Sequence, residues 1–200
     1  MMDNLPANIP KTALIELREA FIPSETPDNS YLELSIRIAD EDLAVRDLSA
    51  FLDFIDGIYG RLAKEGFQSY ARREHGHLKV ERIQKGSWEL LLREAITSSY
   101  SHALIIIFLT VKYLPPAINS LASAYNQVEQ GRLARQNRKR IRAEMEQDER
   151  ISRLPKSRRL QLAELIEYLH EKEKDRLHRV IRFTHRRLLD IKVRIKNKDE

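Results

Sequence analysis

Apolar and polar residues alternate strictly in two segments that lie far apart in the chain. Leucine or isoleucine occupies every even position of residues 31–38, and an apolar side chain occupies every odd position of residues 189–196. Successive side chains of a strand point to opposite faces, so this period predicts two half-buried strands. An isolated strand at 189–196 would be unstable, so we expect it to join a sheet formed by the first half of the chain. Its exposed row would be Lys192, Arg194 and Lys196, whose charges would guard a sheet edge.

Shorter apolar runs at 78–83 and 88–93 flank a turn that contains Gly86. Two such runs around a short glycine-containing loop are typical of a β-hairpin. Between the first strand and this hairpin, apolar residues recur at helical spacing from about 42 to 64, after the acidic cap at residues 40–42. The pattern therefore predicts a strand, a helix and a hairpin.

The second half of the chain has mainly helical periodicity. Residues 95–114 are apolar on nearly every side, and the pair Pro115-Pro116 then interrupts them. Apolar positions at helical spacing predict further helices at about 116–150 and 156–186, separated by Leu154-Pro155. At the other end, the proline-punctuated arm of residues 1–30 contains one apolar stretch, 12–22, which we expect to form a short helix.

These elements predict an α+β fold. We expect a small four-stranded antiparallel or mixed sheet covered by a helix, with a long helical hairpin in the second half. The expected organisation is an N-terminal arm (1–30), a strand–helix–hairpin unit (31–94), a helical region with a basic hairpin (95–188), and a C-terminal strand that returns to the sheet (189–200).

The apolar segment within 95–114 allows more than one interpretation. Its uninterrupted core is nine residues long, from 103 to 111, whereas a membrane span needs about 20. It could be a fully buried helix, a buried strand, or a segment of 96–114 that enters or lies on a membrane. In the membrane alternative, the lipid contacts would be made by the six central residues, Leu104, Ile105, Ile106, Ile107, Phe108 and Leu109.

Charge separates the two halves of the chain. Residues 1–100 carry 12 Lys/Arg and 17 Asp/Glu, whereas residues 101–200 carry 23 and 13, so the halves have balances of −5 and +10. A split of this kind indicates either a face that seeks an anionic partner or two halves that attract each other. The chain has no cysteine and no signal-peptide pattern at its start, so we expect a cytoplasmic protein without disulfides.

The most concentrated charge lies in one run of eleven residues. Four of its members, at 132, 135, 139 and 142, fall along one stripe of a helix, which suits a phosphate backbone. The alternative is a solvated helix balanced by the acidic residues at 144–149. No aromatic residue is interleaved, so the run does not favour base stacking. The predicted anion-binding residues are Arg132, Arg135, Arg138, Lys139, Arg140 and Arg142.

Motifs for catalysis and metal binding are nearly absent from the sequence. It has no glycine-rich phosphate loop, no G-x-S-x-G and no H-E-x-x-H, and its six histidines have no carboxylate partners at metal-ligand spacing. Arg179 and His185 form an arginine–spacer–histidine pattern that resembles HEPN-type ribonucleases, although Val180 stands where that family usually has a polar residue. The resemblance implies a cation for phosphate and a proton shuttle. We expect no metal, no cofactor and no small-molecule substrate.

The sequence therefore predicts a non-enzymatic binding or adaptor protein. We expect it to self-associate through its long charged helices and to contact an anionic partner, with nucleic acid favoured, through the basic helix. The alternatives are a protein that associates with an anionic membrane surface through residues 96–114 and the adjacent basic run, and a HEPN-like ribonuclease.

Overall fold

The computed structural model describes residues 11–39, 45–65, 87–95, 101–115 and 127–197. Within these residues the strands are β1 (Tyr31–Ala39), β2 (Ser87–Ala95) and β3 (Leu188–Lys196). The helices within them are α1 (Lys11–Phe21), α2 (Val45–Glu65), α3 (Ser101–Lys112), α4 (Gln127–Gln147), α5 (Glu149–Ser152), α6 (Lys156–Lys172) and α7 (Lys174–Arg187). The protein is thus a mixed helix-and-strand fold, as the sequence predicts.

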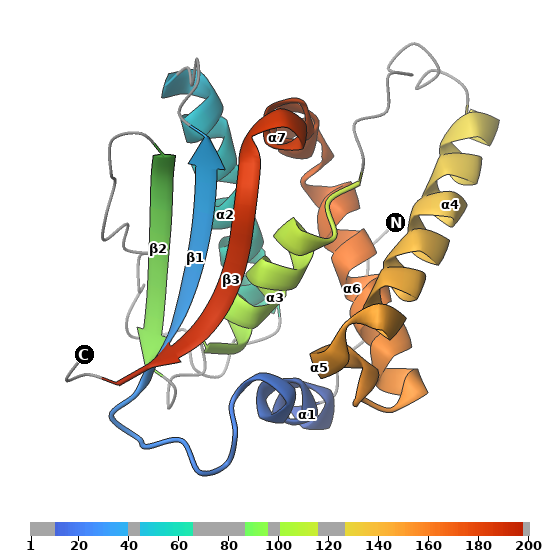
Figure 1. Cartoon of the computed structure of the whole chain (residues 1–200). Helices are drawn as coiled ribbons and strands as arrows, with labels where there is room; N and C mark the ends of the chain where they lie inside the picture. The colour runs from blue at the N-terminus through green and yellow to red at the C-terminus, as the bar shows by residue number, and fades with distance from the viewer. Residues whose placement is uncertain (1–10, 40–44, 66–86, 96–100, 116–126, 198–200) are drawn as a thin grey trace.

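The C-terminal strand returns to the sheet built by the first half of the chain (Figure 1). The strand order is β2-β1-β3, and β1 pairs in antiparallel fashion with both neighbours. Tyr31 at the start of β1 lies opposite Ala95 on one side and Lys196 on the other. The predicted docking of residues 189–196 is therefore confirmed, and it makes β1 the central strand of the three.

The expected sheet had four strands, and the structure shows three. The fourth, at 78–83, falls outside the residues that the structure describes, as does the turn at Gly86. Both described pairings are antiparallel. The part of the prediction that holds is a small antiparallel sheet combined with helices.

The alternating residues of β1 form the centre of the core. Its even-numbered leucine and isoleucine side chains, at 32, 34, 36 and 38, are fully buried. α2 contributes Phe51, Phe54 and Ile58, which are also fully buried and recur at helical spacing. The alternation in β1 and the helical spacing in α2 therefore both mark residues that belong to the same hydrophobic core.

α3 occupies the middle of the molecule, between the sheet and the outer helices (Figure 1). It packs against all three strands and against α1, α2 and α6. All residues from Ala103 to Val111 are buried. A helix with neighbours on every side needs apolar residues on every side, which explains why residues 103–111 show no polar face. The buried-helix interpretation of this segment is the one that the structure shows.

The second half forms a helical hairpin, but its second arm is not one helix. A single helix over 156–186 is wrong, because the chain breaks at Glu173 into α6 and α7. The Glu173 side chain is buried, and its carboxylate binds Arg61 of α2 and Arg176 of α7. This buried ion pair turns α7 onto α2, where the two helices pack together.

A glycine on α2 makes room for that ion pair. A Cβ atom placed on Gly57 would lie 2.6 Å from Oε2 of Glu173 and 2.4 Å from Nη1 of Arg176. Atoms cannot approach so closely, so the absence of a side chain at this position lets the charged groups reach α2.

Candidate basic helix surface

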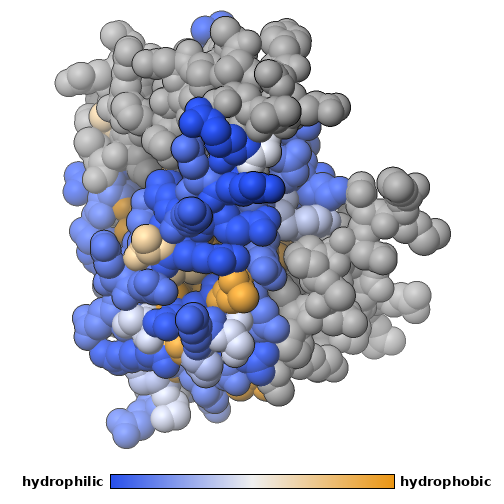
Figure 2. Space-filling view, turned by 90° about the vertical axis from the view of Figure 1, so that its right-hand side faces the viewer, coloured by the Kyte–Doolittle hydropathy of each residue, from blue (hydrophilic) through white to orange (hydrophobic). Residues whose placement is uncertain are grey.

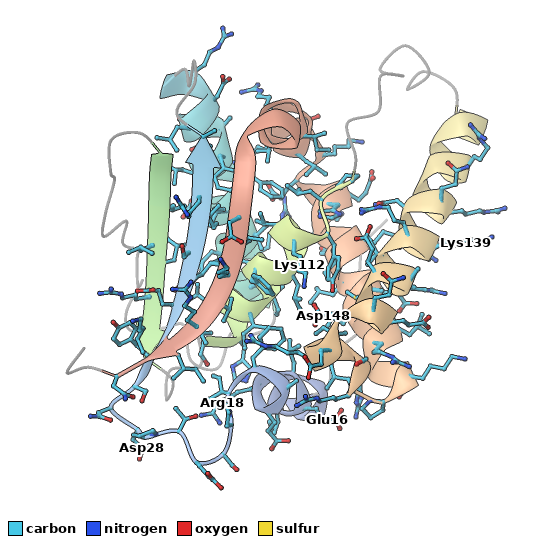
Figure 3. All side chains as sticks on the ribbon, in the orientation of Figure 1. Glu16, Arg18, Asp28, Lys112, Lys139 and Asp148 are labelled. Atoms are coloured by element: carbon cyan, nitrogen blue, oxygen red, sulfur yellow. The ribbon has the colours of Figure 1, made fainter. Side chains whose placement is uncertain are left out.

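One face of α4 carries the outward-pointing part of the predicted basic run. Ile141 and Met145 are buried and fix which side of α4 faces the protein. Arg132, Arg135 and Lys139 are exposed and follow one another at intervals of three and four residues, so they share one side of the helix. Lys139 points away from the rest of the molecule (Figure 3). We call these three residues the α4 basic row.

Two other members of the run are turned toward α6. Nε of Arg138 lies 2.6 Å from Oε2 of Glu167, and Nη2 of Arg142 lies 4.0 Å from Oε1 of Glu164. The hydrogen bond to Glu167 raises the pKa of Arg138 above its ordinary value. These two pairs align α4 with α6 in antiparallel fashion and reduce the charge that this edge of α4 presents to a partner.

Arg140 is directed into the protein. Its Nη1 lies 2.7 Å from Oε1 of Glu144, and its Nη2 donates to the backbone carbonyls of Tyr113 and Leu114 at 2.9 and 3.0 Å. Tyr113 and Leu114 directly follow α3, in a part of the chain whose carbonyls have no partners within the helix. Arg140 therefore ties α4 to the central helix. The structure brings three of the six predicted residues together on the outward side and assigns the other three to internal contacts.

The acidic residues that follow the run have partners outside the α4 basic row. Glu144 binds Arg140, Asp148 binds Lys112, and Glu149 binds Arg153 at 2.8 Å. Glu146 is exposed, but it follows Lys139 by seven residues, about 10 Å along the helix. At that distance its field is largely screened at physiological salt. The charge of the row is therefore not cancelled by the acidic segment beside it.

Asp148 joins three elements at the end of α4. Its carboxylate binds Lys112, accepts a hydrogen bond from the Tyr113 hydroxyl at 3.2 Å, and caps α5 by accepting from the backbone N–H groups of Arg150 and Ile151 (Figure 3). Burial alone raises the pKa of Asp148, but the hydrogen bond and charge of Lys112 outweigh it and hold the pKa below 3.8. Burial and the nearby carboxylate raise the pKa of Tyr113 well above 10.0.

The predicted lipid contacts are inside the protein. All six side chains from Leu104 to Leu109 are buried. Within the described parts of the chain, no helix combines the length and the apolarity needed to cross a bilayer. Among the described residues on the side that carries α4 and α6, hydrophilic surface predominates and hydrophobic residues form small separate patches (Figure 2). The six side chains that would contact lipid in the membrane alternative are therefore not at the surface of the protein.

The histidines offer no assembled site in the described residues. His170 is fully buried, and its Nε2 donates to the backbone carbonyl of Thr110 at 3.0 Å. Its Nδ1 has no hydrogen-bond partner among the residues that the structure describes. Burial, and to a lesser extent the charge of Arg140, lower the pKa of His170 to about 4. No group of three or more potential metal ligands occurs among the residues with described positions.

The proposed ribonuclease pair lies on one helix. Arg179 is exposed on α7, and position 185 belongs to the same helix, although its side chain falls outside what the structure describes.

Self-association stays a prediction. In the described regions, the large hydrophobic side chains that are exposed are only Ile15 and Leu160.

Comparison with known proteins does not assign the chain to a family. No protein-family model, no curated protein and no solved structure matches the chain.

Proposed function

We propose that the chain is a non-enzymatic binding protein that contacts nucleic acid through the α4 basic row. One observation carries the proposal: Arg135 and Lys139 are exposed and, among the described residues, have no acidic partner. The other basic residues nearby are paired: Arg138 and Arg142 with glutamates of α6, and Arg140 with Glu144 of α4 itself. A protein that needed these charges only for its own fold would be expected to pair them in the same way.

The dimensions of the row suit a phosphate backbone. Its seven-residue span is about 10 Å long, and duplex DNA carries one phosphate charge per roughly 1.7 Å of its axis. Arginine adds a planar fork of N–H donors that can bind two phosphate oxygens together. Such contacts position a nucleic acid without reading its sequence. We therefore propose binding with little sequence preference.

The number of cations sets the expected salt dependence. Three phosphate contacts predict a slope of about −2.7 when the logarithm of the association constant is plotted against that of salt concentration. Affinity would then fall about 40-fold between 50 and 200 mM NaCl. Neutralising two of the three cations should reduce the slope to about −0.9.

The test compares two charge-reversal variants by fluorescence anisotropy with a labelled duplex of about 20 base pairs. The first variant, Arg135→Glu with Lys139→Glu, changes the row. The control, Lys156→Glu with Lys174→Glu, changes the net charge equally at two exposed lysines that begin α6 and α7. Acidic residues are favourable at helix N-termini, so the control should fold normally.

We expect the row variant to bind at least about tenfold more weakly at 50 mM NaCl and the control to bind like the wild type. Equal loss in both variants would show only a general attraction between opposite charges and would overturn the proposal. Wild-type binding by the row variant would overturn it too. The same titration with phosphatidylserine vesicles tests the membrane alternative, which is supported if vesicles bind through the row and the duplex does not.

A further inference from the structure

A hollow of about 370 Å³ lies where the C-terminal part of β3 approaches α1 and α5. Six residues line it: Phe21 from α1, Arg150 from α5, and Val193, Arg194, Ile195 and Lys196 from β3. Its volume is at the lower end of the range of about 300–1,000 Å³ found for small-molecule sites. Three parts of the chain that are distant in sequence meet here, so no local pattern could reveal it.

One side of the hollow is apolar and firmly held. Phe21 and Val193 are only 4% and 5% exposed, and Ile195 is half-buried. The Phe21 ring meets Phe108 of α3 edge to face, with 5.9 Å between the ring centroids. This packing leaves the ring little freedom to move into the hollow and fill it. Ile195, together with the small exposed parts of Phe21 and Val193, therefore forms the apolar part of the lining.

The rest of the lining is cationic. The Arg150 guanidinium lies over the Phe21 ring, 5.4 Å from the ring centroid. The backbone of Arg150 is held in place because Asp148 caps α5. Arg194 is exposed at the edge of the sheet, and Glu33, which lies opposite it in register, binds Arg93 at 2.8 Å. Within the described part of the chain, neither Arg150 nor Arg194 forms an ion pair. Lys196 adds a third positive charge, and the lining includes no acidic residue.

We propose that this hollow binds a small organic anion with an apolar body and a terminal carboxylate or phosphate group. The body would pack against Ile195 and the small exposed parts of Phe21 and Val193, and the charged group would meet the donors of Arg150 and Arg194. Arginine suits this task because its fork matches both carboxylate and phosphate oxygens. The proposal is independent of nucleic-acid binding by α4, since the two sites share no residue.

The experiment is an NMR titration of the ¹⁵N-labelled full chain with two probes, phenyl phosphate and 4-phenylbutyrate, which distinguish the two anionic groups. Benzyl alcohol supplies an apolar body without charge, and inorganic phosphate supplies charge without an apolar body. We expect at least one of the organic anions to saturate with a dissociation constant on the order of 1 mM or below. The shifted amides should be those of residues 21 and 193–196.

Two double variants with equal charge changes separate this site from general attraction. Arg150→Gln with Arg194→Gln removes the proposed anion contacts. Arg153→Gln with Lys192→Gln removes neighbouring exposed charges, each paired with an acidic residue and neither lining the hollow. We expect the first variant to weaken binding of the organic anion at least about tenfold and the second to leave it unchanged.

Several results would overturn the proposal. Equal binding of benzyl alcohol would show a hydrophobic site without anion preference, and equal binding of inorganic phosphate would show a charge effect without a role for the apolar wall. Loss of binding in both double variants, or shifts confined to α4, would place the interaction elsewhere. An unchanged NMR spectrum in all four titrations would show that the hollow does not bind this class of ligand.

Discussion

Protonation of His170 should destabilise the protein under mildly acidic conditions. Its neutral ring fits the core, because Nε2 donates to the Thr110 carbonyl while Nδ1 carries no proton and has no acceptor within the described residues. A second proton would place an unpaired N–H and a positive charge in the core, near Arg140. The pKa is therefore lowered from 6.5 to about 4 in the folded protein.

The sign and size of the effect follow from these two values. Below pH 6.5 the unfolded chain takes up a proton at this site and the folded chain does not, so stability is lost as the pH falls from 6.5 toward 4. At pH 5 the unfolded site is almost fully protonated and the folded site about one-tenth protonated, which corresponds to a loss of about 2 kcal/mol. The complete effect, below pH 4, is about 3 kcal/mol.

The free energy of unfolding should be measured by urea titration with circular dichroism at several pH values from 7.5 to 5. The comparison is with His170→Gln, whose side-chain amide can still donate to the Thr110 carbonyl but does not titrate. The variant can be less stable at every pH, so the relevant quantity is the change with pH. We expect the wild type to lose about 2 kcal/mol more than the variant between pH 7.5 and 5.

Asp148 and Asp190, whose pKa values are lowered, do not contribute to the change in stability between pH 7.5 and 5. The lowered pKa values of Asp148 and Asp190 lie under 3.8, so their stabilising contributions are lost only at lower pH. Equal losses of stability in wild type and variant over the range 7.5 to 5 would refute the reasoning, since they would assign the pH dependence to other groups.

Two further substitutions test contacts that hold the helices in place. Gly57→Ala should destabilise the protein by about 1–3 kcal/mol because the added methyl displaces the buried ion pair beside it, whereas Gly60→Ala, three residues later with open space around its Cβ, should be neutral or stabilising by up to about 1 kcal/mol. The urea midpoint should therefore fall for Gly57→Ala and stay the same or rise for Gly60→Ala, and a midpoint for Gly57→Ala that does not fall below that of Gly60→Ala would contradict the proposed close approach. Asp148→Ala should cost about 3 kcal/mol at pH 7.5 through loss of the α5 cap and the Lys112 pair, and Asp148→Asn, which retains a capping oxygen, should cost less. Equal midpoints for these two variants would show that the cap contributes nothing.

Local periodicity was sufficient to predict much of the fold. The alternation in residues 31–38 and 189–196 predicted β1 and β3, and the requirement that a strand have a partner predicted their pairing. The all-round apolar character of residues 103–111 pointed to a buried helix, which α3 is. In each case the signal lies within a few residues of the element it describes.

Long-range contacts account for what the sequence did not reveal. The break at Glu173 depends on Arg61, which is 112 residues away, so helical periodicity continued through the break without a signal. The basic run was likewise divided by glutamates of α6, and the pairs between Arg138 and Glu167 and between Arg142 and Glu164 could not be assigned before the two helices were placed together. Counting charges along one helix overestimated how many of them face outward.

The hollow beside β3 was missed for the same reason. The alternation predicted an exposed row of Lys192, Arg194 and Lys196; Lys192 and Arg194 are exposed, and Lys196 is half-buried. Nothing in the sequence, however, indicated that Phe21 and Arg150 would lie beside that strand. Only the approach of α1 and α5 turns a charged strand edge into a cavity.

The position of β3 has a consequence for the order in which the chain can fold. During translation, β1 emerges from the ribosome before residues 188–196, which supply the strand on one of its two sides. Until that part is synthesised, the pairing edge of an apolar strand has no native neighbour, and such edges are prone to pair with other chains. The interval before residues 188–196 are synthesised is therefore the stage at which this edge of β1 is most exposed to pairing with other chains.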